Sequence, residues 1–332
     1  MKYIDLFGGI GGFSYGIKQA TKGKWECVYY NDFDKYAVQT YNKNYGENYE
    51  ATDITTVKTT DIPDHDCICG GFPCQTFSIA GKRKGFEDIR GTMFFEIMRI
   101  AKAKRTKYLF LENVKGLLNH NKGKTFTTIL QTLEELGYEV QWMVLNSKFF
   151  GVPQNRERVF IIGSLRGECR PEILPFSWND GQTPEGLSKG YSSKTISTRT
   201  GSTAKQQTII NHSLYPRSSK TNKGGTGHLT KMDGSTYCLD TGNMQGLETH
   251  NTITEAIGRQ GSSKEYKSSC KKIYGNTNQI RRLTPTECER LQGFPDGWTE
   301  GVSDTQRYKQ MGNAVTTNVI EAIVRSWESN KK

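Results

Sequence analysis

Short apolar runs alternate with amphipathic stretches through the first 165 residues of the 332-residue chain. The apolar runs lie at 3–7, 25–30, 67–69, 108–111, 140–145 and 159–162. Between them, Met93, Ile97 and Ala101 recur at helical spacing, and a second helical pattern at 126–133 is followed by Gly137 where a capping glycine belongs. This alternation predicts a parallel α/β sheet.

Composition excludes several classes of protein. Hydrophobic residues make up 34% and aromatic residues 11% of the chain, which is enough to build a core and excludes global disorder. No apolar stretch reaches the ~18 residues of a membrane span, and the first apolar run leads straight into glycines without room for a signal peptide. We therefore expect a cytoplasmic protein with no membrane association.

The cysteines and the net charge narrow the choice of partners. The eight cysteines contain no Cys-x-x-Cys pair and no Cys/His zinc spacing, so we expect reduced thiols and no metal site. The formal net charge of +11 favours a polyanionic partner, although this signal is weak by itself.

The composition changes near residue 178. Residues 180–280 hold 13 Gly and 28 Ser or Thr, and their Lys and Arg outnumber their Asp and Glu. About 100 residues is too long for a plain loop, so we expect a small, loop-rich domain. Thr284, Pro285 and Glu287 then predict a helix start. We expect a catalytic domain at 1–177 plus 301–332 and a second domain, with its hinge, at 178–300.

A cluster of glycines at 8–12 follows the first apolar run. Glycines there allow a tight turn and let a ligand approach the N-terminus of the next helix. Asp32 ends the second run, where a carboxylate can accept hydrogen bonds from ribose hydroxyls. The pattern suits an adenosine-type cofactor, although Ser14 replaces the third glycine of the dinucleotide fingerprint. A tight turn without a ligand is the alternative.

Three further motifs stand where chemistry is expected at the edge of such a sheet. Cys74 follows Gly-Gly-Phe-Pro after the third run and is a candidate thiolate nucleophile, or a buried structural thiol. Glu112 lies at the end of the fourth run and is a candidate acid with a raised pKa, or a helix cap. Arg156 and Arg158 can hold a carboxylate or phosphate, or form a surface ion-pair cluster.

A polar, glycine-containing segment at 76–92 carries four basic residues: Lys82, Arg83, Lys84 and Arg90. It is interpreted either as a basic lid over a phosphate backbone or as a solvated surface loop.

Taken in order, these motifs resemble those of the DNA cytosine-C5 methyltransferase family, and its compact bacterial and phage restriction-modification enzymes in particular. The matching motifs are Phe-Gly-Gly-Ile-Gly at 7–11, Pro-Cys-Gln at 73–75, Glu-Asn-Val at 112–114, Gln-Asn-Arg-Glu-Arg at 154–158, and two later ones within 282–295 and 310–315. The resemblance covers roughly residues 1–165 and 280–325, with the variable basic segment before the last two motifs.

The resemblance implies a Rossmann-like domain dependent on S-adenosylmethionine, a small target-recognition domain, and DNA in the cleft between them. The cofactor, released as S-adenosylhomocysteine, would contact Phe7, Gly9, Gly11, Gly12, Asp32, Phe33, Asp53, Ile54, Pro73, Met93, Asn313 and Ala314. Asp32 would bind the ribose and Phe33 would stack near the adenine. The family usually has Glu where this chain has Asp32, and the shorter carboxylate predicts weaker cofactor binding.

The resemblance also implies roles in catalysis. Cys74 would form a covalent adduct with C6 of a flipped-out cytosine, Glu112 would act at N3, and Arg158, beside Arg156, would orient Glu112 or the base. The residues expected to contact DNA from the closing loop are Gln75, Ser78, Arg83 and Arg90. Implied partners are double-stranded DNA and a cognate restriction endonuclease, and we expect a monomer.

Three alternatives stay open at this point. A tRNA cytosine-C5 methyltransferase shares the cysteine and Glu-Asn-Val motifs. An oxidoreductase that uses NAD would account for the first glycines only, and ultraviolet absorbance of a copurified cofactor separates it. A catalytically dead DNA-binding protein is disfavoured by the intact Cys74, Glu112 and Arg158.

Overall fold

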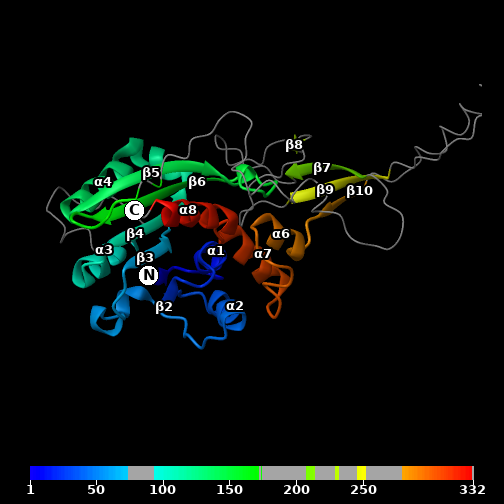
Figure 1. Ribbon diagram of the computed structural model, residues 1–332. Helices are drawn as coiled ribbons and strands as arrows, with labels where there is room; N and C mark the ends of the chain where they lie inside the picture. Colours follow the sequence, from blue (N-terminus) through cyan, green and yellow to red (C-terminus); the bar gives the residue numbers. More distant parts are fainter. Residues whose placement is uncertain are drawn as a thin grey trace, which may run out of the picture.

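The computed structural model describes residues 1–73, 93–171, 173, 207–213, 229–231, 245–251 and 279–330 (Figure 1). Within 207–281 only the backbone of the strands is described.

A six-stranded sheet forms the centre of the protein, in the order β2-β1-β3-β4-β6-β5. Its strands are β1 (Lys2–Leu6), β2 (Glu26–Asn31), β3 (Cys67–Gly71), β4 (Tyr108–Val114), β5 (Tyr138–Asn146) and β6 (Glu157–Leu165). All six apolar runs are confirmed as strands. Strands β1 to β4 pair in parallel, as predicted.

Strand β6 corrects the expectation of a wholly parallel sheet. It pairs antiparallel with both β4 and β5. Only residues 147–156 join β5 to β6, which is too short for the helical crossover that a parallel pair requires. The two strands therefore form a hairpin, and β6 inserts between β4 and β5.

Helices cover both faces of this sheet (Figure 1). The α-helices are α1 (Gly12–Thr21), α2 (Lys35–Tyr45), α3 (Met93–Lys104), α4 (Lys124–Glu135), α6 (Pro285–Leu291), α7 (Asp304–Asn313) and α8 (Thr317–Ser329). Short 3-10 segments lie at η1 (Ile54–Thr56), η2 (Thr59–Asp61), η4 (Lys115–Gly123) and η5 (Ser147–Phe149). Apolar residues of α1 and α8 pack on one face, and those of α3 and α4 on the other. The helical patterns expected around 93–101, 126–133 and 285 are confirmed.

Helices α1 and α8 approach closely although they lie at opposite ends of the sequence. A Cβ added at Gly16 would lie 2.6 Å from the Cβ of Ile320 and 2.7 Å from the carbonyl oxygen of Thr317. Phe13 and Ile17 of α1 share a buried cluster with Ile320 and other residues of α8. The last helix therefore completes the core that the first strand begins.

A second, antiparallel sheet has the order β10-β9-β7-β8. Its strands are β7 (Gln207–Ser213), β8 (Leu229–Lys231), β9 (Gln245–Asn251) and β10 (Gln279–Arg282). The domain boundaries near 178 and 300 stay predictions.

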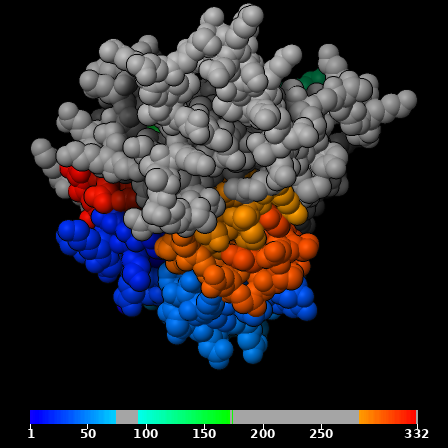
Figure 2. Space-filling model, turned by 90° about the vertical axis from the view of Figure 1, so that its right-hand side faces the viewer, coloured from blue at the N-terminus to red at the C-terminus, as the bar shows by residue number. Residues whose placement is uncertain are grey.

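The segment that follows β10 packs on the first residues of the chain. Leu283, Leu291 and Trp298 share a buried cluster with Ile10 and Ala37. Figure 2 shows this segment, coloured orange, as a continuous surface against the blue N-terminal elements. The chain thus returns from the second sheet directly onto the turn after β1.

Candidate active site

The carboxyl ends of parallel strands β1 to β4 meet at one edge of the sheet. In α/β folds this edge is where ligands bind. It gathers the turn at residues 8–12, here called the glycine turn, together with Asp32, Gly71 and Glu112. The glycine turn, Asp32 and the predicted acid Glu112 therefore share one edge.

Backbone conformation in and beside the glycine turn explains its composition. Phe7, Gly9 and Gly11 have φ values of 54°, 56° and 85°. A Cβ at Gly9 would meet no atom within 4 Å, so the space over that residue is open. A Cβ at Gly11 would lie 2.5 Å from the ring of Tyr45, so only glycine fits there. The turn is open on one side and closely packed on the other.

Asp32 lies next to this turn. Its carboxylate accepts hydrogen bonds from the backbone N–H of Gly9 (2.9 Å) and of Asp34 (2.8 Å). Burial raises the pKa of Asp32, and these backbone hydrogen bonds oppose the rise. A carboxylate has roughly four acceptor sites, so capacity remains for ribose hydroxyls. Phe33, directly after it, is 77% exposed and offers a ring face.

Three other expected cofactor residues lie at the starts of two elements, Asp53 and Ile54 at η1 and Met93 at α3. Asp53 caps η1 through the N–H of Thr55, and Ile54 is buried behind it. Met93 packs in the same apolar cluster as Phe7. A hydroxyl acceptor, an exposed ring and an open glycine turn are the groups that S-adenosylmethionine requires, so the residues present fit this cofactor.

The start of α1 lies against the turn between α7 and α8. A Cβ at Gly12 would lie 2.7 Å from the side chain of Val315. This contact brings the neighbouring Asn313 and Ala314 toward the glycine turn. Pro73, the last of the expected cofactor residues, is exposed after β3.

Glu112 and Arg158 form the candidate acid and its partner. Arg158 Nε lies 3.0 Å from Glu112 Oε1, and both side chains are largely buried. Burial raises the pKa of Glu112, while the positive charges of Arg158 and Arg156 oppose the rise. A Cβ at Gly71 would lie 3.0 Å from Glu112 Oε2, so a glycine at the end of β3 leaves room for the carboxyl group. This group can hold a proton and donate it.

The structure places Arg156 and Arg158 at different points. Arg156 is 2% exposed, and its Nη2 donates to the carbonyl oxygens of Gly312 (3.1 Å) and Ala314 (2.7 Å). It therefore supports the turn that carries Asn313 and Ala314. Its expected role at the reacting base stays a prediction.

Sequence reasoning missed the role of Asn113. This buried side chain donates from Nδ2 to the carbonyl oxygen of Phe72 at 2.8 Å. It holds the backbone two residues before Cys74. The available signal in the sequence was the position of this amide, directly after Glu112 at the end of an apolar run. Cys74, Gln75, Ser78, Arg83 and Arg90 lie outside the described residues.

Comparison with known proteins supports one assignment. The family model described as C-5 cytosine-specific DNA methylase matches residues 1–329. The chain belongs to this family.

Relatives of this C-5 cytosine-specific DNA methylase cover nearly all of it. The Type II methyltransferase M1.ScrFI of Lactococcus lactis subsp. cremoris is 42% identical over 97% of this chain and 76% of the relative. M.NlaX of Neisseria lactamica is 38% identical over 99% and 96%. A DNMT2 mutant structure from Spodoptera frugiperda superposes with a TM-score of 0.64 at 20% identity, covering 98% of each chain, and supports the fold.

The described part of this C-5 cytosine-specific DNA methylase contains no candidate membrane span and no candidate metal centre. None of its described helices is long and apolar enough to cross a membrane. The described residues also hold no group of three metal-ligating side chains.

Proposed function

We propose that the protein is a DNA (cytosine-5)-methyltransferase that modifies cytosine within a specific duplex sequence, with S-adenosylmethionine as cofactor. The observation that carries this proposal is the buried Glu112–Arg158 pair, at the same sheet edge as the glycine turn and Asp32. A proton donor beside an adenosine-type pocket is what methylation of a weakly nucleophilic carbon requires.

The chemistry begins at C6, because C5 of cytosine is a poor nucleophile. The Cys74 thiolate forms a bond to C6, and Glu112 donates a hydrogen bond or proton at N3, which spreads the developing charge. S-adenosylmethionine supplies the methyl group that C5 takes up. C5 then loses its proton to a base, the Cys74–C6 bond breaks, and the thiolate leaves. Arg158 keeps the Glu112 carboxyl group aimed.

Cofactor binding and base access depend on different parts of the chain. Asp32 would accept hydrogen bonds from the ribose, Phe33 would stack near the adenine, and Asp53 with Ile54 would contact the adenine side. The target base must leave the duplex to reach these groups, because C6 and C5 are covered within the stack. Gln75, Ser78, Arg83 and Arg90 would hold the DNA, with loops in roughly 178–280 reading its sequence.

The setting of the enzyme follows from the same proposal. We infer a cytoplasmic monomer that acts on double-stranded DNA. The Type II names of the relatives suggest a cognate restriction endonuclease in the same system.

The proposal is tested by transfer of a labelled methyl group to duplex DNA and, in parallel, to tRNA. Cys74→Ser and Glu112→Gln should each abolish the label on DNA. The matched control Cys169→Ser, at an exposed cysteine, should retain it. Bisulfite sequencing then maps the site.

Two results would contradict the proposal. Label on tRNA alone would assign the protein to the RNA-modifying alternative. Unchanged DNA methylation by Cys74→Ser would remove the covalent mechanism.

A further inference from the structure

Three consecutive carbonyl groups of the glycine turn each accept a hydrogen bond from an aromatic side chain. The hydroxyl of Tyr30 donates to Gly9 (2.6 Å), the indole Nε1 of Trp298 to Ile10 (3.0 Å), and the hydroxyl of Tyr45 to Gly11 (2.8 Å). Tyr30 and Trp298 are buried, and Tyr45 is partly buried.

These contacts fix the peptide planes of the turn. In a trans peptide the N–H points opposite to the preceding C=O. Holding the carbonyl groups of Gly9 and Gly11 on the aromatic side therefore directs the N–H groups of Ile10 and Gly12 to the other side. The open space over Gly9 shows that the turn is accessible away from its packed side.

Trp298 differs from the two tyrosines in its origin. It follows Ile10 by 288 residues and lies in the loop between α6 and α7, beyond the second sheet. Its ring packs against Tyr15 (5.0 Å between centroids), Phe294 (5.1 Å) and Tyr45 (5.8 Å). One wall of the glycine turn is thus supplied by the C-terminal part of the chain.

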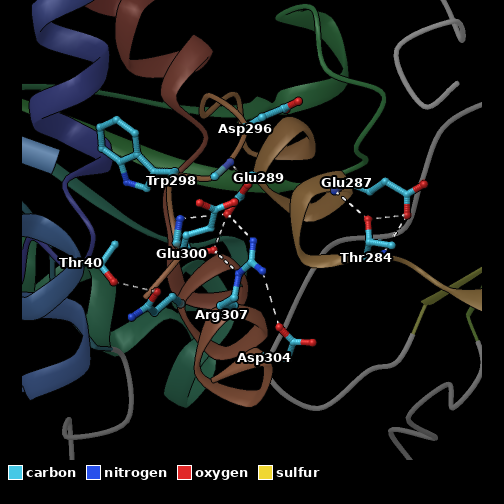
Figure 3. Close-up of polar contacts among 12 residues, drawn as sticks. Thr40, Thr284, Glu287, Glu289, Asp296, Trp298, Glu300, Asp304 and Arg307 are labelled. Carbon is cyan, nitrogen blue, oxygen red and sulfur yellow. Dashed lines mark hydrogen bonds and ion pairs between the residues drawn. The ribbon is translucent and has the colours of Figure 1, made fainter. Parts of the chain in front are cut away.

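A buried carboxylate holds the loop that carries Trp298. Glu289 Oε2 accepts from the N–H of Gly297 (2.8 Å), and Oε1 accepts from the N–H of Thr299 (2.9 Å) and from its hydroxyl. Arg307 Nη2 lies 3.1 Å from the same carboxylate and supplies the balancing charge. Figure 3 shows these contacts, here called the Glu289 cluster, converging beside Trp298. The backbone is therefore fixed on both sides of the indole.

We propose that Trp298 is a positioning residue for S-adenosylmethionine and that the Glu289 cluster sets its place. The indole holds the Ile10 carbonyl, so the segment returning from the second sheet shapes the turn on which the cofactor sits. This inference rests on the proposed binding of S-adenosylmethionine at the glycine turn.

The test compares two variants with the same chemical change. Trp298→Phe removes the hydrogen bond to Ile10, and Trp25→Phe removes the one that Trp25 Nε1 makes to Glu328 (2.9 Å) far from the turn. Both indoles are buried. Titration calorimetry gives the Kd for S-adenosylhomocysteine in the full chain, and steady-state kinetics give kcat and the KM for cofactor and for DNA.

A lost buried hydrogen bond of about 1 kcal/mol corresponds to a roughly fivefold weaker Kd for Trp298→Phe. Its KM for S-adenosylmethionine should rise in step, while kcat at saturation and the KM for DNA stay within about twofold. Trp25→Phe should leave all four values unchanged. Tyr45→Phe, which removes one oxygen, should weaken cofactor binding in the same direction and serves if Trp298→Phe does not fold.

Two outcomes would overturn the inference. Equal Kd values for Trp298→Phe, Trp25→Phe and the wild type would show that the Ile10 contact only stabilises the fold. Wild-type protein that binds no S-adenosylhomocysteine would overturn the proposed function and the inference with it.

Discussion

At the scale of single residues, buried polar groups carry both the chemistry and the constraints on pH. Asp5 in β1 is fully buried, and its Oδ2 accepts a hydrogen bond from Ser14 Oγ at 2.8 Å. Its other oxygen has no partner among the described residues. Burial raises the pKa of Asp5 from 3.8 to about 7. The titratable groups around it are Tyr3, Cys27, Tyr30, Asp32, Tyr41, Tyr45 and Cys69.

This shift predicts a pH dependence of stability. Between pH 3.8 and about 7 the folded protein holds a proton on Asp5 that the unfolded chain has released, so the free energy of unfolding falls as the pH rises. Asp5→Asn removes this dependence. We expect the variant to gain Tm relative to the wild type at pH 8 and little at pH 5, measured by calorimetry without cofactor. A Tm difference that does not vary with pH would contradict the assignment.

The site was predictable where its residues follow strand ends. Asp32 and Glu112 could be named because a carboxylate after an apolar run is visible in the sequence. Trp298 could not, because its contact with Ile10 joins residues that the sequence separates by most of its length. The hydrogen bond from Asn113 to Phe72 was also missed, because it joins residues of two different segments, one in β4 and one after β3.

At the scale of elements, local sequence pattern predicts most helices and strands, whereas tertiary contacts determine the rest. The six strands of the central sheet follow from short apolar runs, helices α3 and α4 from apolar residues at helical spacing, and α6 from its capping residues. The direction of β6 did not follow, because it depends on the short connection after β5. Helix α2 has no plain apolar stripe, because Thr40, Tyr41 and Tyr45 form much of its packed face.

The contact between α1 and α8 predicts an intolerant glycine. Alanine at Gly16 would gain about 1 kcal/mol in helix propensity. Its Cβ, however, would fall 2.6 Å from Ile320 and 2.7 Å from the backbone oxygen of Thr317 and force the helices apart, which costs about 2–3 kcal/mol. We expect Gly16→Ala to lower the free energy of unfolding in urea by about 1–2 kcal/mol net, because two backbones must move. Gln19→Ala, on the exposed face of α1, is the control and should change little.

The start of α6 predicts a second difference in stability. Thr284 and Glu287 form a capping box, with the Thr284 Oγ1 accepting from the N–H of Glu287 at 3.2 Å. Thr284→Ala should lower the free energy of unfolding by about 1 kcal/mol. Ser303 begins α7 without a side-chain cap, so Ser303→Ala should have a much smaller effect. Equal losses in a urea titration would show that the capping contact contributes nothing.

At the scale of the whole molecule, charge dominates. The 45 Lys and Arg residues outnumber the 34 Asp and Glu residues, which gives the net charge of +11. Ion pairs such as Lys104–Asp64 and Lys115–Glu157 therefore leave an excess of positive charge. A polyanionic duplex is the matching partner, and its binding releases counterions.

This charge predicts that salt weakens the binding of duplex DNA much more than the binding of S-adenosylhomocysteine. Between 50 and 200 mM salt the affinity for duplex DNA should fall on the order of a thousandfold for about six phosphate contacts. The affinity for S-adenosylhomocysteine should change less than about twofold. Fluorescence anisotropy and calorimetry measure the two. A shallow salt slope for DNA would contradict a phosphate-based interface.

The packing of α1 on α8 also determines when, during translation, the apolar face of α1 can be buried. Ile17 and Ile320 belong to the same buried cluster, but about 300 residues are translated between them. At roughly 5–20 residues per second, α1 leaves the ribosome roughly 15–60 seconds before α8 exists. During that interval its apolar face lacks its cover and is a target for chaperones. A nascent chain without α8 lacks part of the cluster that α1 and α8 share, so we expect DNA modification to start only after α8 has been made.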